Sequence, residues 1–370
     1  MKNKFFTGIS ILIGTCIGAG ILAIPHLASQ SGFFPTLFLI FILTALMILI
    51  NLYIGEITLR TNEKHQLSGY AEKYLGRNGK ILMEFAAIFG IFSAVIAYLY
   101  GFGESISFLI YGNTGSFILF GCLFGILMSA LIWRGIHGLK KIEKINVSLI
   151  IFALALLFII FLKKIDFSNL SYIYSKNFFV PFGVILFSLL CFSAIPEINF
   201  AIGKDKKSMK KIIIVGMLAV AMVYSLFTFV VIGLNGLNTP EIATLSLGII
   251  FVIFGILTMF GAYVALGNAL EQTFISDNKF SKVKSWFLSS IIPIILFVLI
   301  SYFNIFSFSK ILSIGGVISG GLTGILVLLT LKKAKKEGNR KPEYSILLNW
   351  FLIILLSLIF IGAILFELFY

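Results

Sequence analysis

The chain has 370 residues, of which 59% are hydrophobic and 12% charged, and its mean hydropathy is +1.06. Soluble domains carry about 25% charged residues and could not bury this much apolar surface, so a water-soluble enzyme is excluded. A disordered chain is excluded by the high hydrophobicity. The apolar runs are long and unbroken, unlike the ~10-residue alternating segments of an outer-membrane barrel. The composition therefore predicts an all-α integral membrane protein surrounded by a lipid bilayer.

The net charge of +14 does not predict a nucleic-acid partner, because basic residues of membrane proteins collect in cytoplasmic loops. The three cysteines (Cys16, Cys122 and Cys191) form no CxxC pair, so neither a disulfide framework nor a zinc site is indicated. The start of the chain, with Lys2 and Lys4 before an apolar run, resembles a signal peptide. It lacks a clear small-x-small cleavage site, so we interpret it as a retained first helix.

Eleven segments approach the ~20 apolar residues that a membrane span needs. They lie at about 5–29, 33–59, 81–111, 115–133, 145–162, 178–202, 211–234, 243–274, 285–303, 308–331 and 345–369. With the N-terminus inside, 25 of the 29 Lys and Arg residues fall in cytoplasmic segments. This asymmetry predicts an N-in, C-out topology. The polar segment 66–80 is predicted to form a short interfacial helix that ends near Gly76.

An odd number of spans suggests ten spans that form two five-span units and one additional span. Two five-span units insert in opposite directions, which is the requirement for an inverted repeat around a site at the midplane. The predicted units are 1–164 (spans 1–5), 165–336 (spans 6–10) and 337–370 (the extra eleventh span). The tripeptide Ala-Ile-Pro occurs in both proposed equivalents, spans 1 and 6, at 23–25 and 194–196, which supports the repeat.

Span 1 carries Gly14, Gly18 and Gly20, followed by Pro25, and is predicted to break in the middle. Within lipid, open backbone is tolerated only where it lines a polar cavity or is buried in protein. A break would bare amide groups at the start of the outer half-helix, where the positive dipole end favours a carboxylate. The carbonyls before the break would face a cation. The alternative is that Gly14-xxx-Gly18 is a packing face between helices.

Span 6 contains Pro196, which is predicted to kink the helix, and directly after it the carboxylate of Glu197. An ionisable residue inside a span is a functional candidate. The alternative is that Glu197 lies near the cytoplasmic end, facing water or pairing with Lys204. Glu104, toward the outer end of span 3, could line an entrance. Glu56, with Arg60 four residues later, is predicted to form a structural pair.

The sequence contains no row of arginines within a span, no selectivity-filter motif, no phosphate-binding loop and no HExxH zinc motif. We therefore predict that the chain is not an enzyme and carries no cofactor. The sequence indicates no particular oligomeric state.

The run Gly14-Thr15-Cys16-Ile17-Gly18-Ala19-Gly20-Ile21-Leu22-Ala23-Ile24-Pro25 resembles the first-span signature of the amino acid/auxin permease family, part of the amino acid–polyamine–organocation superfamily, and of its relatives the bacterial aromatic amino acid permeases. The segments 97–104 and 312–316 are similar to the third and tenth spans of that family. The resemblance implies a five-plus-five inverted-repeat fold with broken helices 1 and 6. It also implies ion-coupled secondary transport of amino acids by alternating access across the plasma membrane of a prokaryotic cell.

Carried over by position, the resemblance implies that the backbone amides of Ala19 and Gly20 hold the substrate carboxylate. Tyr98 and Phe192 are expected to close over the substrate, which predicts a neutral amino acid with an apolar or aromatic side chain. The full set of expected substrate-binding residues is Thr15, Cys16, Ala19, Gly20, Tyr98, Cys191, Phe192 and Ser193.

The coupling ion stays open between H⁺ and Na⁺. Sodium would be held by the carbonyls of Gly14 and Ile17, the Thr258 hydroxyl and the Gly255 carbonyl, whereas Met259 stands where relatives often have a second hydroxyl. Protons would use Glu197, whose expected partial burial would raise its pKa, or secondly Glu104. Because Met259 provides no hydroxyl at this position, the sequence slightly favours protons over sodium as the coupling ion.

A second class of function is a permease-like membrane receptor, or nutrient sensor, on the same fold. The spore-germination proteins are similar in length and carry a comparable Gly-rich first span. They usually end after ten spans, so the eleventh span favours the transporter.

Overall fold

The computed structural model describes residues 2–134, 152–153, 155–276 and 278–369. These residues are helices joined by loops, and β-structure among them is limited to one isolated bridge between Gly32 and Ile173. Eight of the described helices are long and apolar enough to cross a membrane, or nine if one sharply bent pair counts as a single span. The prediction of a helical, multi-pass membrane protein is confirmed.

The helices follow the predicted spans in order. Their bounds are α1 (Lys2–Cys16), α2 (Gly20–Ser31), α3 (Phe33–Arg60), α4 (Leu67–Tyr111), α5 (Phe117–Arg134), α7 (Phe182–Ser188), α8 (Ala194–Ala201), α9 (Met209–Asn235), α10 (Ile249–Ser276), α11 (Lys282–Trp286), α12 (Ile292–Tyr302), α13 (Phe308–Glu337) and α14 (Trp350–Phe369). Residues 145–151 and 154 of the predicted fifth span, 145–162, lie outside the described residues. The predicted sixth span consists of α7 and α8, each too short to cross a membrane alone.

Several boundaries differ from the predicted ones for local reasons. Gly76 adopts φ 76° inside α4, so the interfacial helix ends there as predicted and span 3 follows at an angle. Gly248, with φ 91°, delays α10 to Ile249. Pro293 lacks an N–H for the helical ladder, and a π-helical turn (Phe287–Ile291) precedes it between α11 and α12. The last helix begins only at Trp350.

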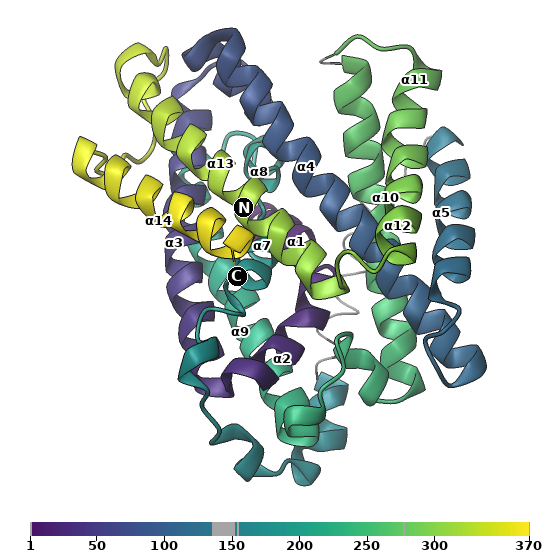
Figure 1. Cartoon of the computed structure of the whole chain (residues 1–370). Coiled ribbons are helices and arrows are strands. Elements are labelled where there is room, and N and C mark those ends of the chain that lie inside the picture. Colours follow the sequence, from purple (N-terminus) through teal and green to yellow (C-terminus); the bar gives the residue numbers. More distant parts are fainter. Residues whose placement is uncertain (1, 135–151, 154, 277, 370) are drawn as a thin grey trace.

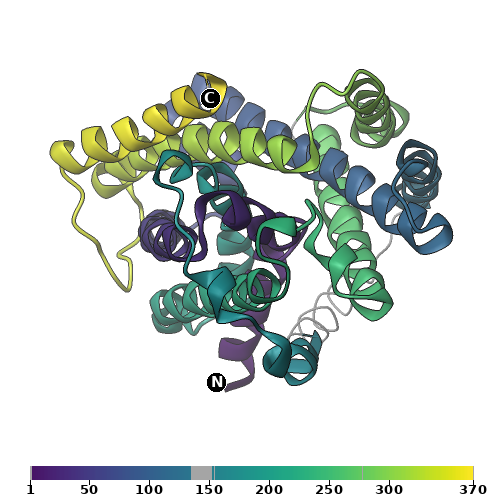
Figure 2. The same cartoon turned by 60° about the horizontal axis from the view of Figure 1, so that its bottom comes forward.

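The helices form two groups. In the first, α1, α2, α3, α7, α8 and α9 pack against one another, and in the second α4, α5, α10, α11 and α12 do so. Figure 1 shows α5, α10, α11 and α12 together at the right and the first group at the centre and left, and Figure 2 shows the same division from another side. We call these the first and second helix groups.

Helix α13 joins the two groups through its glycines. A Cβ at Gly315 would lie 2.5 Å from Cβ of Ser93 in α4, and one at Gly316 would overlap the carbonyl of Gly183 in α7. A Cβ at Gly324 would overlap the ring of Phe360 in α14. Small residues let helix backbones approach closely in membranes, so α13 contacts three neighbours on three of its faces.

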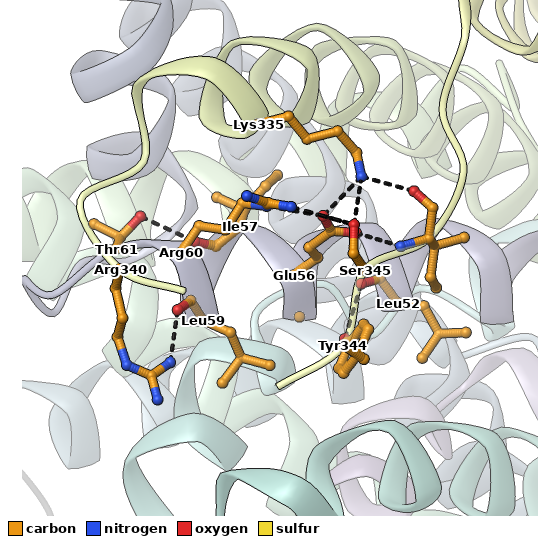
Figure 3. Close-up of polar contacts among 12 residues, drawn as sticks. Leu52, Glu56, Ile57, Leu59, Arg60, Thr61, Lys335, Arg340, Tyr344 and Ser345 are labelled. Atoms are coloured by element: carbon orange, nitrogen blue, oxygen red, sulfur yellow. Dashed lines mark hydrogen bonds and ion pairs between the residues drawn. The ribbon is translucent and has the colours of Figure 1, made fainter. Parts of the chain in front are cut away.

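We call the side at which α1 begins and α3 ends the N-terminal face, and the opposite side, where α13 begins and α14 ends, the C-terminal face. At the N-terminal face, residues 338–349 link α13 to α14 and run along the end of α3 (Figure 3). We call this linking segment, residues 338–349, the strap. Its Tyr344 donates to the Leu52 carbonyl at 2.9 Å, and its Arg340 donates to the Leu59 carbonyl at 2.6 Å.

The strap is anchored on Glu56 of α3, whose side chain is fully buried. Its carboxylate accepts hydrogen bonds from Arg60 and Lys335, both at 2.8 Å, from Ser345 at 2.9 Å and from the Ile346 amide at 2.8 Å (Figure 3). The predicted pair with Arg60 is confirmed, and three further donors that sequence spacing does not reveal complete the site. A buried carboxylate is stable only with such partners.

We expect Glu56→Ala to lower the free energy of unfolding by about 3–5 kcal/mol, because two cations lose their buried partner. The matched control is Glu72→Ala: Glu72 pairs with Lys80 at 3.0 Å but is 51% exposed, so its loss should cost below about 1 kcal/mol. Unfolding of the purified variants in detergent measures both. Equal stability of the two variants would contradict the anchoring role of Glu56.

Candidate functional site

The first helix break lies between α1 and α2, which are bent by 57°. The break predicted in span 1 is confirmed, and the structure shows why glycine is needed there. A Cβ at Gly18 would lie 2.6 Å from the Tyr98 hydroxyl of α4, and one at Gly20 would overlap the Ser188 hydroxyl of α7. Gly20 was expected to offer its backbone amide to the substrate carboxylate; in this conformation its close neighbour is Ser188.

The second break spans residues 189–193, between α7 and α8. Pro196 was expected to cause it, but Pro196 is the third residue of α8 and lies beyond the break. In the first turn of a helix the missing N–H of proline has no helical partner to lose. The first residues of α2 and α8 receive no side-chain cap. Both breaks therefore present helix N-terminal amides within the protein.

Tyr224 of α9 connects the two breaks. Its hydroxyl lies 2.8 Å from the carbonyl of Cys16 and 2.7 Å from the carbonyl of Ser188, the last residues of α1 and α7. The side chain is fully buried. Carbonyls at helix C-termini lack helical partners and carry the negative end of the helix dipole. One buried hydroxyl thus contacts the C-terminal carbonyls of both α1 and α7. A single tyrosine within an apolar run of sequence does not reveal this role.

The expected substrate-binding residues fall into two sets. Cys16, Ala19, Gly20, Tyr98, Cys191 and Phe192 are buried around the breaks, and the hydroxyl of Tyr98 is hydrogen-bonded to the backbone of Ala19. Thr15 and Ser193 are exposed. The Thr15 hydroxyl donates to the Ile11 carbonyl of its own helix at 2.8 Å. The structure brings the first set together and leaves the second at its edge.

The expected sodium ligands come from α1, from the residue after it and from α10. The Thr258 hydroxyl donates to the Gly255 carbonyl at 2.8 Å. A Cβ at Gly255 would lie 3.1 Å from the Thr244 hydroxyl and 3.7 Å from Leu22 of α2. Gly14 is half-buried and Ile17 is buried.

The two candidate proton carriers have different surroundings. Glu197 was expected to be partly buried, but its side chain is exposed. This expectation was wrong because α8 starts only three residues earlier and turns this position outward. Glu104 of α4 is half-buried and lies close enough to Glu241 for the two carboxylates to repel each other.

Glu241 belongs to a polar cavity of about 450 Å³ at the C-terminal face. Its carboxylate accepts from the Ser309 amide at 2.9 Å and from the Ser309 hydroxyl. Across the cavity, Glu367 pairs with Lys310 at 2.8 Å and accepts from Ser313. The lining residues are His26, Leu27, Gln30, Val180, Glu241, Ser307, Ser309, Lys310, Ser313, Phe366 and Glu367. The sequence reasoning missed this cavity, because its charged residues Glu241, Lys310 and Glu367 come from three separate segments.

A smaller cavity of about 290 Å³ lies at the N-terminal face, between the ends of α3 and α8 and the strap. Glu63 in its wall is hydrogen-bonded by Lys73, and this bond lowers the pKa of Glu63 to about 2. Lys206, also in the wall, donates to the carbonyl and side chain of Asn199. Glu63 and Lys206 in this wall are thus both engaged in local hydrogen bonds.

We expect Tyr224→Phe to lower the free energy of unfolding by about 1–3 kcal/mol, since two buried carbonyls lose their donor. Tyr263→Phe is the matched control, because Tyr263 is equally buried but its hydroxyl has no hydrogen-bond partner among the described residues. That change should be neutral or stabilising. Thermal or denaturant unfolding in detergent distinguishes them, and equal effects would refute the bridging role of Tyr224.

Comparison with known proteins gives several bacterial relatives. The chain is 28% identical over 219 residues to the tyrosine-specific transport system 1 of Haemophilus influenzae, covering 58% of this chain and 54% of the relative. It is 25% identical over 305 residues to glutamine transporter 2 of Aliivibrio fischeri, covering 75% and 78%. It is 23% identical over 243 residues to the low affinity tryptophan permease of Escherichia coli K12, covering 63% and 59%. The first alignment thus spans about half the length of that relative.

The identity of these relatives agrees with the match of the chain to the model of one protein family. Residues 1–245 of the 370 match the tryptophan/tyrosine permease family, a segment that includes both helix breaks and Tyr224. The chain is therefore a member of the tryptophan/tyrosine permease family, a family of membrane permeases and not of enzymes.

Proposed function

We propose that this protein, a multi-pass protein of the bacterial cell membrane, is a secondary active transporter of neutral amino acids with apolar or aromatic side chains. The observation that carries the proposal is the meeting of two broken helices at a buried centre in a chain of a permease family. Relatives named as tyrosine, tryptophan and glutamine transporters support a neutral amino acid substrate.

The substrate's charged ends would be held by the backbone at the two breaks. Residues 16–20 and 189–193 contain no Lys or Arg, so a carboxylate would bind the amides of Ala19 and Gly20 at the start of α2. The ammonium group would bind the carbonyl ends of α1 and α7 near Tyr224. Tyr98 and Phe192 would then enclose an apolar side chain.

The grouping of the helices supports the finer fold proposal of eleven spans in a five-plus-five inverted repeat, N-in and C-out. Numbered by span, the first helix group holds spans 1, 2, 6 and 7, and the second holds spans 3, 4, 8 and 9. Within each group, every span has its repeat equivalent, the span numbered five higher or five lower, in the same group. A repeat related by two-fold symmetry requires this, because equivalent helices must have equivalent neighbours.

The same grouping supports alternating access. The two groups would move relative to each other around the breaks, with α13 as the common support. Thr15 and Ser193 are exposed on the N-terminal side of the breaks, while residues 16–25 are buried. We infer that this conformation gives access to the site from the N-terminal face.

For coupling we propose protons carried by Glu104. Its half-burial and its position beside Glu241 disfavour two simultaneous charges. The exposed Glu197 is the weaker candidate. Sodium held by Gly14, Ile17, Gly255 and Thr258 is the alternative, and Met259 beside Thr258 offers it no second hydroxyl.

Uptake by proteoliposomes that contain the purified protein tests the substrate class. Tyr, Trp, Phe and Leu should compete with labelled substrate, whereas Glu and Lys should inhibit at least about a hundredfold more weakly, because an unpaired charge buried at the breaks costs ~3–5 kcal/mol. Strong inhibition by Glu or Lys alone would contradict the pocket. Saturable binding without uptake of any amino acid would favour the receptor.

The coupling proposal predicts that accumulation rises as the external pH falls. Glu104→Gln should remove about a tenfold accumulation ratio for each pH unit of gradient, the energy that one coupled proton supplies, yet keep substrate exchange. Glu197→Gln is the control and should accumulate normally. Uptake that requires Na⁺ at fixed pH, and that is lost in Thr258→Ala, would overturn proton coupling.

A further inference from the structure

We propose that Cys16, Cys191 and Met217 form a binding site for one soft monovalent metal ion, Cu(I) or its surrogate Ag(I). The three residues come from the end of α1, from the second break and from α9. Thiolate and thioether sulfur are the ligands that Cu(I) prefers over harder oxygen donors. Groups of three or more His, Cys, Asp or Glu side chains suited to a metal are absent from the described residues, and a set with Met as third ligand falls outside that pattern.

The sulfur atoms are already close together. Sγ of Cys191 lies 3.5 Å from Sδ of Met217, and the thiol of Cys16 is hydrogen-bonded to Cys191. Two sulfur atoms at this separation can both reach one ion at about 2.3 Å, the usual metal–sulfur bond length. Cys191 and Met217 therefore need no rearrangement of the helices to reach one ion, and the Cys16 thiol lies next to Cys191.

The surroundings favour a cation of low charge. All three side chains are at most 5% exposed, so a strongly hydrated divalent ion would have to lose its water. The carbonyl ends of α1 and α7 meet next to Cys16, and their partial negative charge attracts a cation. Asn51 of α3 orients the sulfurs by donating to Cys191 at 3.3 Å and to Met217 at 3.7 Å.

Asn51 adds an independent observation. Its Oδ1 atom is buried and finds no hydrogen-bond partner in the part of the chain that the structure describes, although buried polar atoms are nearly always paired. The amide group is thus fixed with its donor side on the sulfur cluster and an acceptor left over within the same packed centre. An ion held by the sulfurs would give this acceptor a positive charge nearby.

Binding needs no oxidant. The ion forms bonds to the two thiolates and to the thioether, the two S–H bonds break, and two protons leave to solvent. A bound ion would tie the end of α1 to the second break and to α9, and so lock the first helix group. The site itself stands without the proposed transport, because metal binding is measured on the resting protein.

The third cysteine supplies the matched control. Cys122 lies on α5, in the second helix group, and is half-buried. We expect Cys122→Ser, titrated with Ag(I) in detergent, to bind one ion per chain at wild-type affinity. Cys16→Ser and Cys191→Ser should lose this site, and Met217→Leu should weaken it about tenfold. Unchanged affinity in Cys16→Ser, or two ions per chain in Cys122→Ser, would overturn the proposal.

X-ray absorption of Ag(I) bound to Cys122→Ser tests the ligands without altering them. Coordination by three sulfur atoms supports the site, and coordination by two sulfurs or by nitrogen and oxygen overturns it. Metal binding that persists in a protein inactive in uptake would leave the site intact while refuting the transport function, so the two proposals fail separately.

Discussion

The structure depends on the need to satisfy every backbone polar group within a membrane. A helix that breaks in lipid bares amides and carbonyls that water cannot reach, each at a cost of several kcal/mol. Here the two breaks lie together, and the Tyr224 hydroxyl contacts the terminal carbonyls of both α1 and α7. The glycines at the first break let Tyr98 and Ser188 approach its backbone directly. The backbone at the breaks therefore depends on the positions of α4, α7 and α9, which supply the side chains that contact it.

This requirement explains the division into two helix groups. The first group supplies both breaks and the residues that support them, Tyr224 from α9 and Asn51 from α3. The second reaches the breaks through Tyr98 of α4. Helix α13 packs on both groups, with Gly315 against the Ser93 side chain of α4 and Gly316 against the Gly183 backbone of α7.

A buried, paired carboxylate lies at each of the two faces. Glu56 anchors the strap at the N-terminal face, and Glu367 with Lys310 joins α14 to α13 at the C-terminal face. Each carboxylate is buried yet fully partnered, which is the condition under which a buried ion pair is tolerated. Helix α14 is thus tied to the rest of the molecule at its end and, through the preceding strap, at its start.

The sequence by itself determined the membrane class, the positions of most spans and the break in span 1, because hydropathy and clustered glycine act locally along the chain. It also brought out the interfacial helix ending at Gly76. Only the tertiary structure decided that Pro196 lies beyond the second break, that Glu197 is exposed, and that Gly20 packs on Ser188. It alone joined Cys16, Cys191 and Met217, and Glu56 with Lys335. Such contacts link residues up to hundreds of positions apart, and spacing along one helix carries no record of which face another helix will cover.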